Sequence, residues 1–162
     1  MPAFEPVSPE QIPELSTLAT SILREHYDPI LGKAQNDYML QKFQSPEAMQ
    51  QQLSEGYRYY FITDEGEKAG FAGFYPKDGK MYISKLYVSK SHRRRHLARD
   101  CVAFISRQAQ EEGLSALFLN VNRHNDGSIA AYQKMGFSIQ KTEDNPIGCG
   151  YYMNDYVMEK PV

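Results

Sequence analysis

The chain has 162 residues, with 18 Lys and Arg against 20 Asp and Glu, and 41% of its residues are hydrophobic. This composition excludes a disordered or low-complexity chain, and the length predicts a single domain over residues 1–162. No apolar run approaches the roughly 20 residues of a membrane span, and the N-terminus lacks a signal pattern. We therefore expect a soluble, cytoplasmic protein that binds no membrane. Cys101 and Cys149 fit neither a disulfide framework nor a metal motif.

The first third of the chain has the pattern of a short edge strand followed by helices. Pro6 suits an edge position in a strand over 3–7. Ser8 predicts a helix start, because Pro9 and Gln11 follow it at the spacing of a capped first turn. We expect this helix to end near Tyr27, since the pair Asp28-Pro29 disfavours its continuation. A loop over 28–35 should then lead to two short helices, 36–43 and 45–54.

The rest of the chain is rich in strand patterns. Three aromatic and β-branched runs separated by turns predict an antiparallel meander of strands 58–63, 70–75 and 81–88. The next periodic segment predicts a helix over 95–112, whose apolar face is Leu97, Cys101, Val102, Ile105 and Ala109. The last predicted elements are strand 116–121, helix 126–134, strand 137–141, a loop holding Asn145-Pro146, and strand 151–159. This order predicts an α+β fold with a mixed, mostly antiparallel central sheet flanked by helices.

One stretch is strongly basic. Residues 85–99 contain six Lys and Arg and two His, without any Asp or Glu. The stretch joins a predicted strand to a predicted helix, and a helix N-terminus offers unpaired N–H groups and positive potential to a phosphate. A net charge of −2 argues against nucleic acid as the partner. The basic stretch therefore indicates a local site for a small anion.

Two motifs resemble the GNAT acyltransferase superfamily. Leu86-Tyr87-Val88, followed after four residues by the run 93–98, is similar to the family's acetyl-CoA-binding segment, with its signature Q/R-x-x-G-x-G/A. Asn125, Tyr132 and Gly136-Phe137 resemble the family's strand–Asn–helix–Tyr-x-K-x-G-F segment, and the chain's beginning and end resemble bacterial members that include some polyamine acetyltransferases. The chain departs from the motif at His96, where the family has a glycine that lets the backbone approach the pyrophosphate. Because helical backbone angles do not require glycine, we still expect CoA to bind.

The resemblance implies an N-acetyltransferase that moves an acetyl group from acetyl-CoA to a primary amine in a ternary complex. The N–H groups of 93–98 would bind the pyrophosphate, the Val88 N–H would bind the thioester carbonyl, and the pantetheine arm would lie between strands 81–88 and 116–121. Tyr132, whose phenol is protonated at pH 7, would protonate the leaving thiolate or else pack against Phe137. Asn125 would contact the cofactor or cap the following helix. The residues implied in cofactor binding are Leu86, Tyr87, Val88, Arg93, Arg94, Arg95, His96, Leu97, Ala98, Asn125 and Tyr132.

The sequence indicates no single general base. Strand 81–88 offers Tyr82 and Ser84 where some family members have a glutamate, and four other polar residues could position a water: Glu25, Asn120, Asn122 and Asp155. His92 and His124 are expected in solvent, and the four scattered His predict no metal site.

The acceptor and the partners follow from weaker signals. The segments that form the acceptor cleft in the family carry more acidic than basic residues, namely Glu25, Asp28, Asp37, Asp144 and Asp155 against Arg24 and Lys33. This excess would suit a cationic amine such as a polyamine or a peptide amino group. Two other readings are a non-catalytic CoA-binding or CoA-sensing domain and nucleic-acid binding through the basic stretch. The final strand could also pair across a homodimer.

Overall fold

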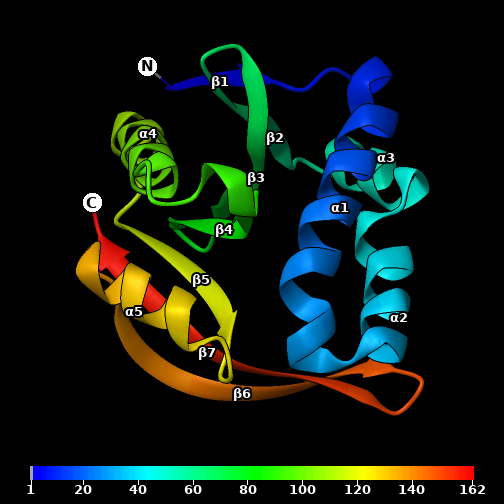
Figure 1. The fold of residues 1–162 in the computed structure, drawn as a ribbon. Coiled ribbons are helices and arrows are strands. Elements are labelled where there is room, and N and C mark those ends of the chain that lie inside the picture. The colour runs from blue at the N-terminus through cyan, green and yellow to red at the C-terminus, as the bar shows by residue number, and fades with distance from the viewer. Residues whose placement is uncertain (1) are drawn as a thin grey trace. The chain divides into compact units, whose positions relative to one another are not determined.

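A computed structural model describes residues 2–162 and has the α+β architecture that the sequence predicts (Figure 1). Within these residues, seven strands form one sheet in the order β1-β2-β3-β4-β5-β7-β6. The strands are β1 (Pro2–Pro6), β2 (Arg58–Asp64), β3 (Glu67–Lys77), β4 (Lys80–Val88), β5 (Ala116–Asn122), β6 (Ser138–Gly148) and β7 (Tyr151–Pro161). The helices are α1 (Ile12–Leu31), α2 (Lys33–Gln44), α3 (Pro46–Ser54), α4 (Leu97–Glu111) and α5 (Asp126–Lys134), with short 3-10 turns η1 (Pro9–Gln11) and η2 (Lys90–His92).

The sheet is mixed and mostly antiparallel, as expected. β4 and β5 pair in parallel, whereas β1–β2, β2–β3, β5–β7 and β6–β7 are antiparallel pairs. β1 lies at one end of the strand order, which confirms the predicted N-terminal edge strand.

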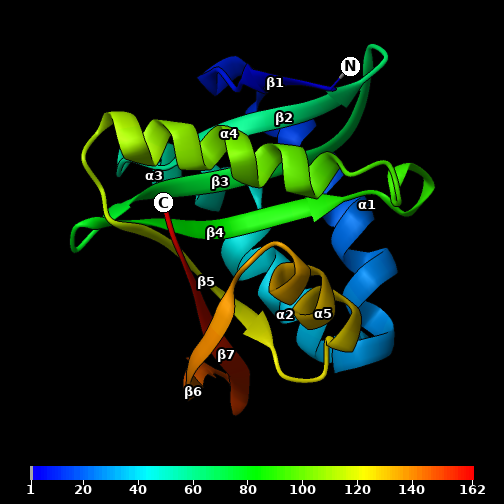
Figure 2. The ribbon, with the colours of Figure 1, turned by 90° about the vertical axis from the view of Figure 1, so that its left-hand side faces the viewer.

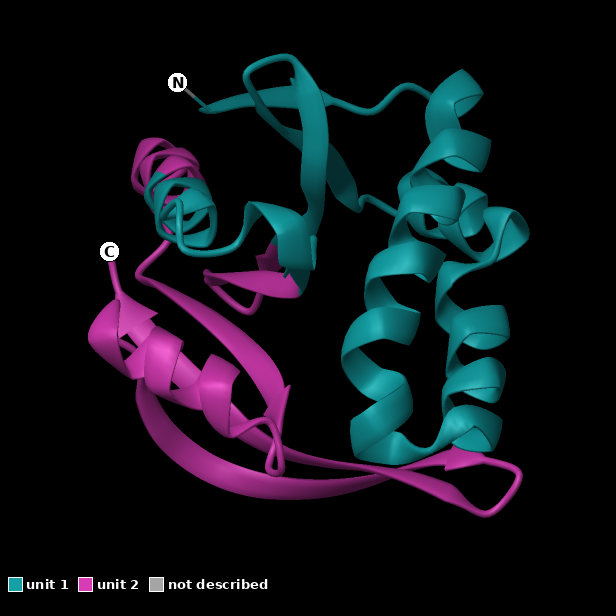
Figure 3. Cartoon of the chain, in the orientation of Figure 1, with its two compact units in different colours: residues 1–75, 85–103 teal, residues 76–84, 104–162 magenta. Residues whose placement is uncertain are grey.

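By its internal contacts the chain divides into two compact units (Figure 3). Unit 1 comprises residues 1–75 and 85–103, and unit 2 comprises residues 76–84 and 104–162. The basic stretch therefore belongs to unit 1, whereas Asn125 and Tyr132 belong to unit 2. The single domain inferred from chain length stays a prediction.

In unit 1, α1 buries its apolar side against aromatic residues of β2 and β3. Ile12, Leu15 and Ala19 are fully buried and join one cluster with Phe61 and Phe71. α1 and α2 run side by side (Figure 1), and β2 and β3 are neighbouring antiparallel strands (Figure 2). The predicted start at Ser8 is confirmed, since the Ser8 N–H donates to Gln11 Oε1 at 3.0 Å and the 3-10 turn η1 leads into α1.

The predicted end of the first helix near Tyr27 is wrong, because α1 continues through Pro29 to Leu31. A proline in the last turn costs only one helical N–H, and other bonds hold this end of the helix. The Asn36 amide donates to Asp28 Oδ1 at 2.7 Å and to the Leu23 carbonyl at 3.2 Å. These tertiary hydrogen bonds outweigh the local preference that would place Asp28 outside a helix.

In unit 2, β6 and β7 form a long hairpin, and the predicted loop between them is wrong. β6 continues past Lys141 and includes Asn145 and Pro146 before the turn at Cys149. A proline without an N–H is tolerated here because β6 is the last strand of the sheet order.

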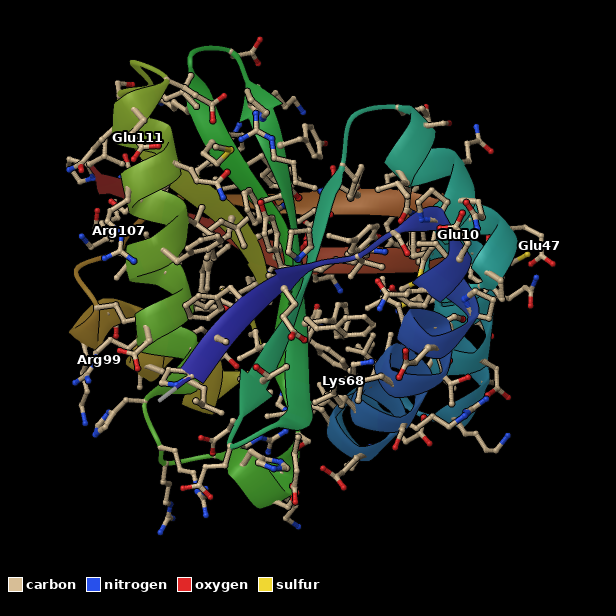
Figure 4. All side chains as sticks on the ribbon, turned by 90° about the horizontal axis from the view of Figure 1, so that it is seen from above. Glu10, Glu47, Lys68, Arg99, Arg107 and Glu111 are labelled. Carbon is tan, nitrogen blue, oxygen red and sulfur yellow. The ribbon has the colours of Figure 1, made fainter. Side chains whose placement is uncertain are left out.

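The helix α4 has the predicted apolar face. Its five predicted core residues are all buried, namely Leu97, Cys101, Val102, Ile105 and Ala109. The charged side chains of Arg99, Arg107 and Glu111 lie on the exposed side of the helix (Figure 4).

Candidate active site

The turn between β4 and α4 has an unusual backbone. Arg94 and His96 adopt φ angles of 67° and 62°, in the left-handed region that favours glycine. α4 begins at Leu97, two residues later than predicted, so His96 precedes the helix. The prediction that His96 has helical backbone angles, so that no glycine is required there, is therefore wrong. The motif glycine suits a left-handed backbone here, and histidine is one of the few other residues enriched in that region.

The first turn of α4 presents main-chain donors. The Asp100 N–H donates to the His96 carbonyl at 3.0 Å, as the first bonds of a helix do. The N–H groups of Leu97, Ala98 and Arg99 come before this bond and have no partner within the helix. Such groups, together with the positive end of the helix dipole, form a site for an anion.

The side chains of two arginines in the basic stretch are hydrogen-bonded within unit 1. Arg95 Nη1 donates to Asp64 Oδ2 at 2.8 Å, and the Asp64 residue is only 8% exposed. Arg93 Nε donates to the Val88 carbonyl at 3.3 Å. Arg93, Arg94 and Arg95 are all exposed, but the guanidinium groups of Arg93 and Arg95 are hydrogen-bonded within unit 1.

The prediction that His92 lies in solvent is wrong, because its side chain is only 16% exposed. His92 Nδ1 lies 2.7 Å from Ser89 Oγ, and its Nε2 lies 3.0 Å from Glu67 Oε2. This chain of hydrogen bonds joins the 3-10 turn η2 to the start of β3.

The end of β4 is held from the β3 side. The Ser89 N–H donates to the Ala69 carbonyl at 2.8 Å, and Gly70 lies so close that a Cβ there would be 2.2 Å from the Tyr87 carbonyl oxygen. Because successive N–H groups of a strand point to opposite edges, the Val88 N–H points away from β3. Leu86 is buried and Tyr87 is half-buried, with its ring 5.6 Å from Phe71.

In unit 2, Asn125 and Tyr132 lie at the two ends of α5. Asn125 is 5% exposed and caps the helix, because its Oδ1 accepts the Ser128 N–H at 3.3 Å. The capping role that the sequence left open is therefore confirmed. Tyr132 is half-buried with its ring edge-on to Phe137 at 5.4 Å between centroids, so the predicted packing is also present.

A polar network crosses β4, β5, β6 and β7 within unit 2. The Asn120 amide donates to Glu143 Oε1 at 3.1 Å and to Asp155 Oδ2 at 3.4 Å, and it accepts the Tyr82 hydroxyl at 3.4 Å. Burial raises the pKa of Asp155, which is 3% exposed. Hydrogen bonds, first of all from Asn145, lower the pKa of Glu143. The two carboxylates therefore differ in their affinity for a proton.

The acidic residues assigned to the acceptor are mostly paired. Asp37 accepts hydrogen bonds from Arg24 and Lys33, which lower its pKa, and Arg123 lies 2.6 Å from Asp144. Asp28 is held by Asn36, as described above. The excess of carboxylates counted in the sequence is thus largely offset by cations and amide donors within each unit.

The sequence did not predict the roles of two residues near the basic turn, Lys85 and Asp64. Lys85 was counted with the basic stretch but is buried, 5% exposed, in unit 1. The signal was its position among the buried residues Ile83 and Leu86 of one strand. Asp64, the partner of Arg95, gave no signal, because its contact depends on tertiary structure alone.

Among residues 2–162, no three His, Cys, Asp or Glu side chains group closely enough to hold a metal ion. In the same range, no helix is long and apolar enough to cross a membrane.

The mixed sheet of this α+β fold has a strand that ends in a basic turn before a helix N-terminus, and such a turn suits a phosphorylated ligand. Residues 20–137 match the Acetyltransferase (GNAT) family, and the chain belongs to this family. The predictions of the GNAT fold, of an N-acetyltransferase and of acetyl-CoA as the acetyl donor are confirmed.

The individual proteins that this chain resembles share only a small part of its sequence. The chain is 25% identical over 145 residues, 82% of each protein, to an uncharacterized N-acetyltransferase in the pepI 3′ region of Lactobacillus delbrueckii subsp. lactis. It is similar in fold to the PaiA N-acetyltransferase from Thermoplasma acidophilum in complex with coenzyme A, with a TM-score of 0.86, 17% identity and coverage of 100% of this chain and 99% of that one. It also resembles the ribosomal-protein-S18-alanine N-acetyltransferase from Escherichia coli, with a TM-score of 0.72, 20% identity and coverage of 100% and 94%.

Proposed function

We propose that this chain acetylates a primary amine in a ternary complex with acetyl-CoA, and that the N–H groups of residues 93–98 bind the pyrophosphate. The backbone of the basic turn is the observation that carries this proposal. Left-handed residues at 94 and 96 bring successive N–H groups toward one another, as in anion-binding nests, and the N-terminus of α4 follows directly. A site built from main-chain donors tolerates histidine in place of the motif glycine if the imidazole turns aside from the phosphates.

The side chains of the turn divide between two roles. Arg94 is exposed and available to a phosphate, whereas Arg93 and Arg95 are engaged with Val88 and Asp64. We therefore assign the contribution of Arg95 to its N–H group rather than to its guanidinium group. The Arg93 N–H already donates to the Lys90 carbonyl at 3.4 Å, so a phosphate would have to share it.

The thioester is assigned to the end of β4. The Val88 N–H, directed away from β3, would donate to the thioester carbonyl and stabilise the negative charge that develops there. Leu86 and Tyr87 would line the same segment. In unit 2 the parallel ladder of β4 and β5 comprises the pairs Met81–Leu117, Tyr82–Phe118 and Ile83–Leu119, whereas β7 pairs with β5 over its whole length, from Ala116 to Asn122. The parallel ladder of β4 and β5 is short, and this supports the proposal that the pantetheine arm pairs with strand edges.

Tyr132 is proposed as the general acid. Acetyl-CoA supplies an activated acetyl group; in the transfer the C–N bond forms, the C–S bond breaks, and the amine loses a proton to water, from which the Tyr132 phenolate regains one after the transfer. The Tyr132 phenol would give its proton to the departing thiolate. Asn125, by holding the start of α5, would help to position the helix that carries Tyr132.

The acceptor is proposed to be a small cationic amine or a peptide amino group. Support comes from Glu143 and Asp155, the two carboxylates of the unit 2 network. The lower pKa of Glu143 favours its negative charge at neutral pH, which would attract a protonated amine.

Calorimetry with acetyl-CoA, followed by an acceptor screen that measures released thiol, tests the proposal. The screen should include polyamines, amino acids, aminoglycosides and peptide N-termini. Tyr132→Phe should lower turnover about 100-fold and leave acetyl-CoA affinity nearly unchanged. Tyr60→Phe is the matched control, since it also removes one hydroxyl and keeps the ring stack on Phe74.

Three outcomes separate the readings. Acetyl-CoA binding without transfer to any amine would favour a non-catalytic CoA-binding domain. Turnover of neutral or acidic acceptors alone would refute the cationic acceptor. Equal turnover of Tyr132→Phe and the parent protein would remove Tyr132 as the acid.

A further inference from the structure

Lys85 is a buried cation without a charged partner among its hydrogen bonds. Its Nζ donates to the Phe43 carbonyl at 2.8 Å, Gln44 Oε1 at 2.8 Å, Gln52 Oε1 at 2.9 Å and the Tyr59 hydroxyl at 2.6 Å. None of these four acceptors carries a charge. Burial lowers the pKa of Lys85 to about 7.

These four acceptors form a cage around Lys85 Nζ. Their number makes the cage sensitive to the charge of the amine. An ammonium group has three N–H donors and uses all of them here, whereas a neutral amine has only two. Tyr59 also donates its own proton to Gln52, so its oxygen is free to accept from Lys85. Loss of one proton from Lys85 therefore leaves part of the cage without a donor.

The other groups around the cage keep one charge state at neutral pH. The rings of Tyr59 and Tyr57 lie 5.2 and 5.8 Å from the ammonium, and burial raises the pKa of Tyr59. From β3, Tyr75 packs on Tyr57 at 4.7 Å, and burial raises its pKa as well. The side of α2 and α3 contributes amide and carbonyl oxygens, and Ser16 of α1 donates to the Gln44 carbonyl at 2.6 Å.

The cage ties the α2–α3 connection to the strand that precedes the proposed thioester site. Lys85 is followed directly by Leu86, Tyr87 and Val88. The main chain of this segment is held by β3 through Ala69 and Gly70, as described above. The Lys85 side chain holds the same segment to α2, α3 and β2. The direction of the Val88 N–H depends on both attachments.

We propose that Lys85 is a positioning residue: its ammonium group fixes the main chain of residues 86–88 and makes the affinity for acetyl-CoA depend on pH. This inference rests on the proposed function, which gives the Val88 N–H to the thioester. A donor that is already oriented loses less freedom on binding and therefore binds more tightly. When Lys85 loses its proton, the cage loosens and acetyl-CoA binding weakens.

Calorimetric titration of acetyl-CoA into the full chain and into Lys85→Met tests the inference. The ratio of the two Kd values should be about tenfold near pH 6 and fall toward one above pH 8, as Lys85 of the parent protein becomes neutral. The ratio cancels every pH effect that both proteins share, including that of the phosphates of acetyl-CoA. Lys80→Met is the matched control on the same strand, because Lys80 pairs with Glu159 at 2.6 Å, and it should give a ratio near one at every pH.

Gln44→Leu provides a test that does not depend on the folding of Lys85→Met. It removes one acceptor and retains the lysine, so the ammonium form loses stabilisation and its pKa falls further. The pH at which acetyl-CoA binding weakens should therefore move to a lower value. A purely structural role of Gln44 would weaken binding equally at all pH values.

The possible outcomes distinguish a failure of this inference from a failure of the proposed function. Tight acetyl-CoA binding with a pH-independent Kd ratio for Lys85→Met, or an unmoved midpoint in Gln44→Leu, would overturn the role of Lys85 alone. An absence of acetyl-CoA binding by the parent protein at every pH would overturn the proposed function and the inference together.

Discussion

Replacement of Gly70 by alanine tests the close approach of β3 to the end of β4. A Cβ at this position would lie 2.2 Å from the Tyr87 carbonyl oxygen and 3.0 Å from the Val88 Cα. Both neighbours are main-chain atoms, so no side-chain rotation relieves the overlap. Gly70→Ala must therefore push the two strands apart at the segment that leads to Val88.

The size of the effect follows from this distance. To widen the Cβ–oxygen separation from 2.2 Å to the 3.0 Å limit of real contacts, the strands must shift by roughly 0.8 Å. Overpacking of this kind costs about 1–3 kcal/mol in the free energy of unfolding. For a chain of this length, that corresponds to a fall in Tm of roughly 2–12 °C.

The assay is thermal unfolding followed by circular dichroism, with Gly127→Ala as the control. Gly127 is the second residue of α5, and a Cβ there would meet nothing within 4 Å. Alanine in an open helical position should stabilise the fold by about 0.5–1 kcal/mol. The same chemical change is thus expected to act with opposite sign at the two positions.

Acetyl-CoA affinity provides the second measurement. Because Gly70→Ala displaces the main chain of Tyr87 and Val88, it should weaken acetyl-CoA binding, whereas Gly127→Ala should leave it unchanged. A Tm of Gly70→Ala within about 1 °C of the parent protein would refute the close approach of the strands. A lower Tm with unchanged acetyl-CoA affinity would instead remove the end of β4 from the binding site.

Two further predictions concern a helix cap and the pH dependence of stability. Asn125→Ala removes the acceptor of the Ser128 N–H and should lower the free energy of unfolding by about 1 kcal/mol, measured by urea denaturation, and Asn125→Asp should restore most of it. Lys85 has a folded pKa of about 7 against 10.5 for an ordinary lysine, so between these values the unfolded chain binds a proton that the folded chain does not. The free energy of unfolding should therefore rise with pH above about 7, by at most about 1.4 kcal/mol per unit. In Lys85→Met this rise should be absent; an equal slope in both proteins would contradict the buried, depressed lysine.

The sequence by itself determined the fold class, the order of elements and the identity of the two motifs. Periodicity was sufficient for α4, whose apolar face of Leu97, Cys101 and Ile105 is buried as predicted, because the face of a helix depends on spacing alone. The helix cap at Ser8 could also be predicted from the sequence, because it is formed between residues three positions apart. The prediction of an anion site at the basic stretch could also be made from the sequence, because its charge and its place before a helix are both local properties.

Only the tertiary structure decided which charges of the basic stretch are available. Arg95 is paired with Asp64, 31 residues away along the chain, and Lys85 is enclosed by groups at least 26 residues away. No pattern over a short window contains such pairs. The same reason explains the helix that continues through Pro29, where Asn36 holds Asp28 from the next helix. The left-handed backbone at His96 was also decided by the fold: α4 begins at Leu97, so residue 96 lies in the turn before the helix, and histidine is one of the few residues besides glycine that are enriched in this conformation.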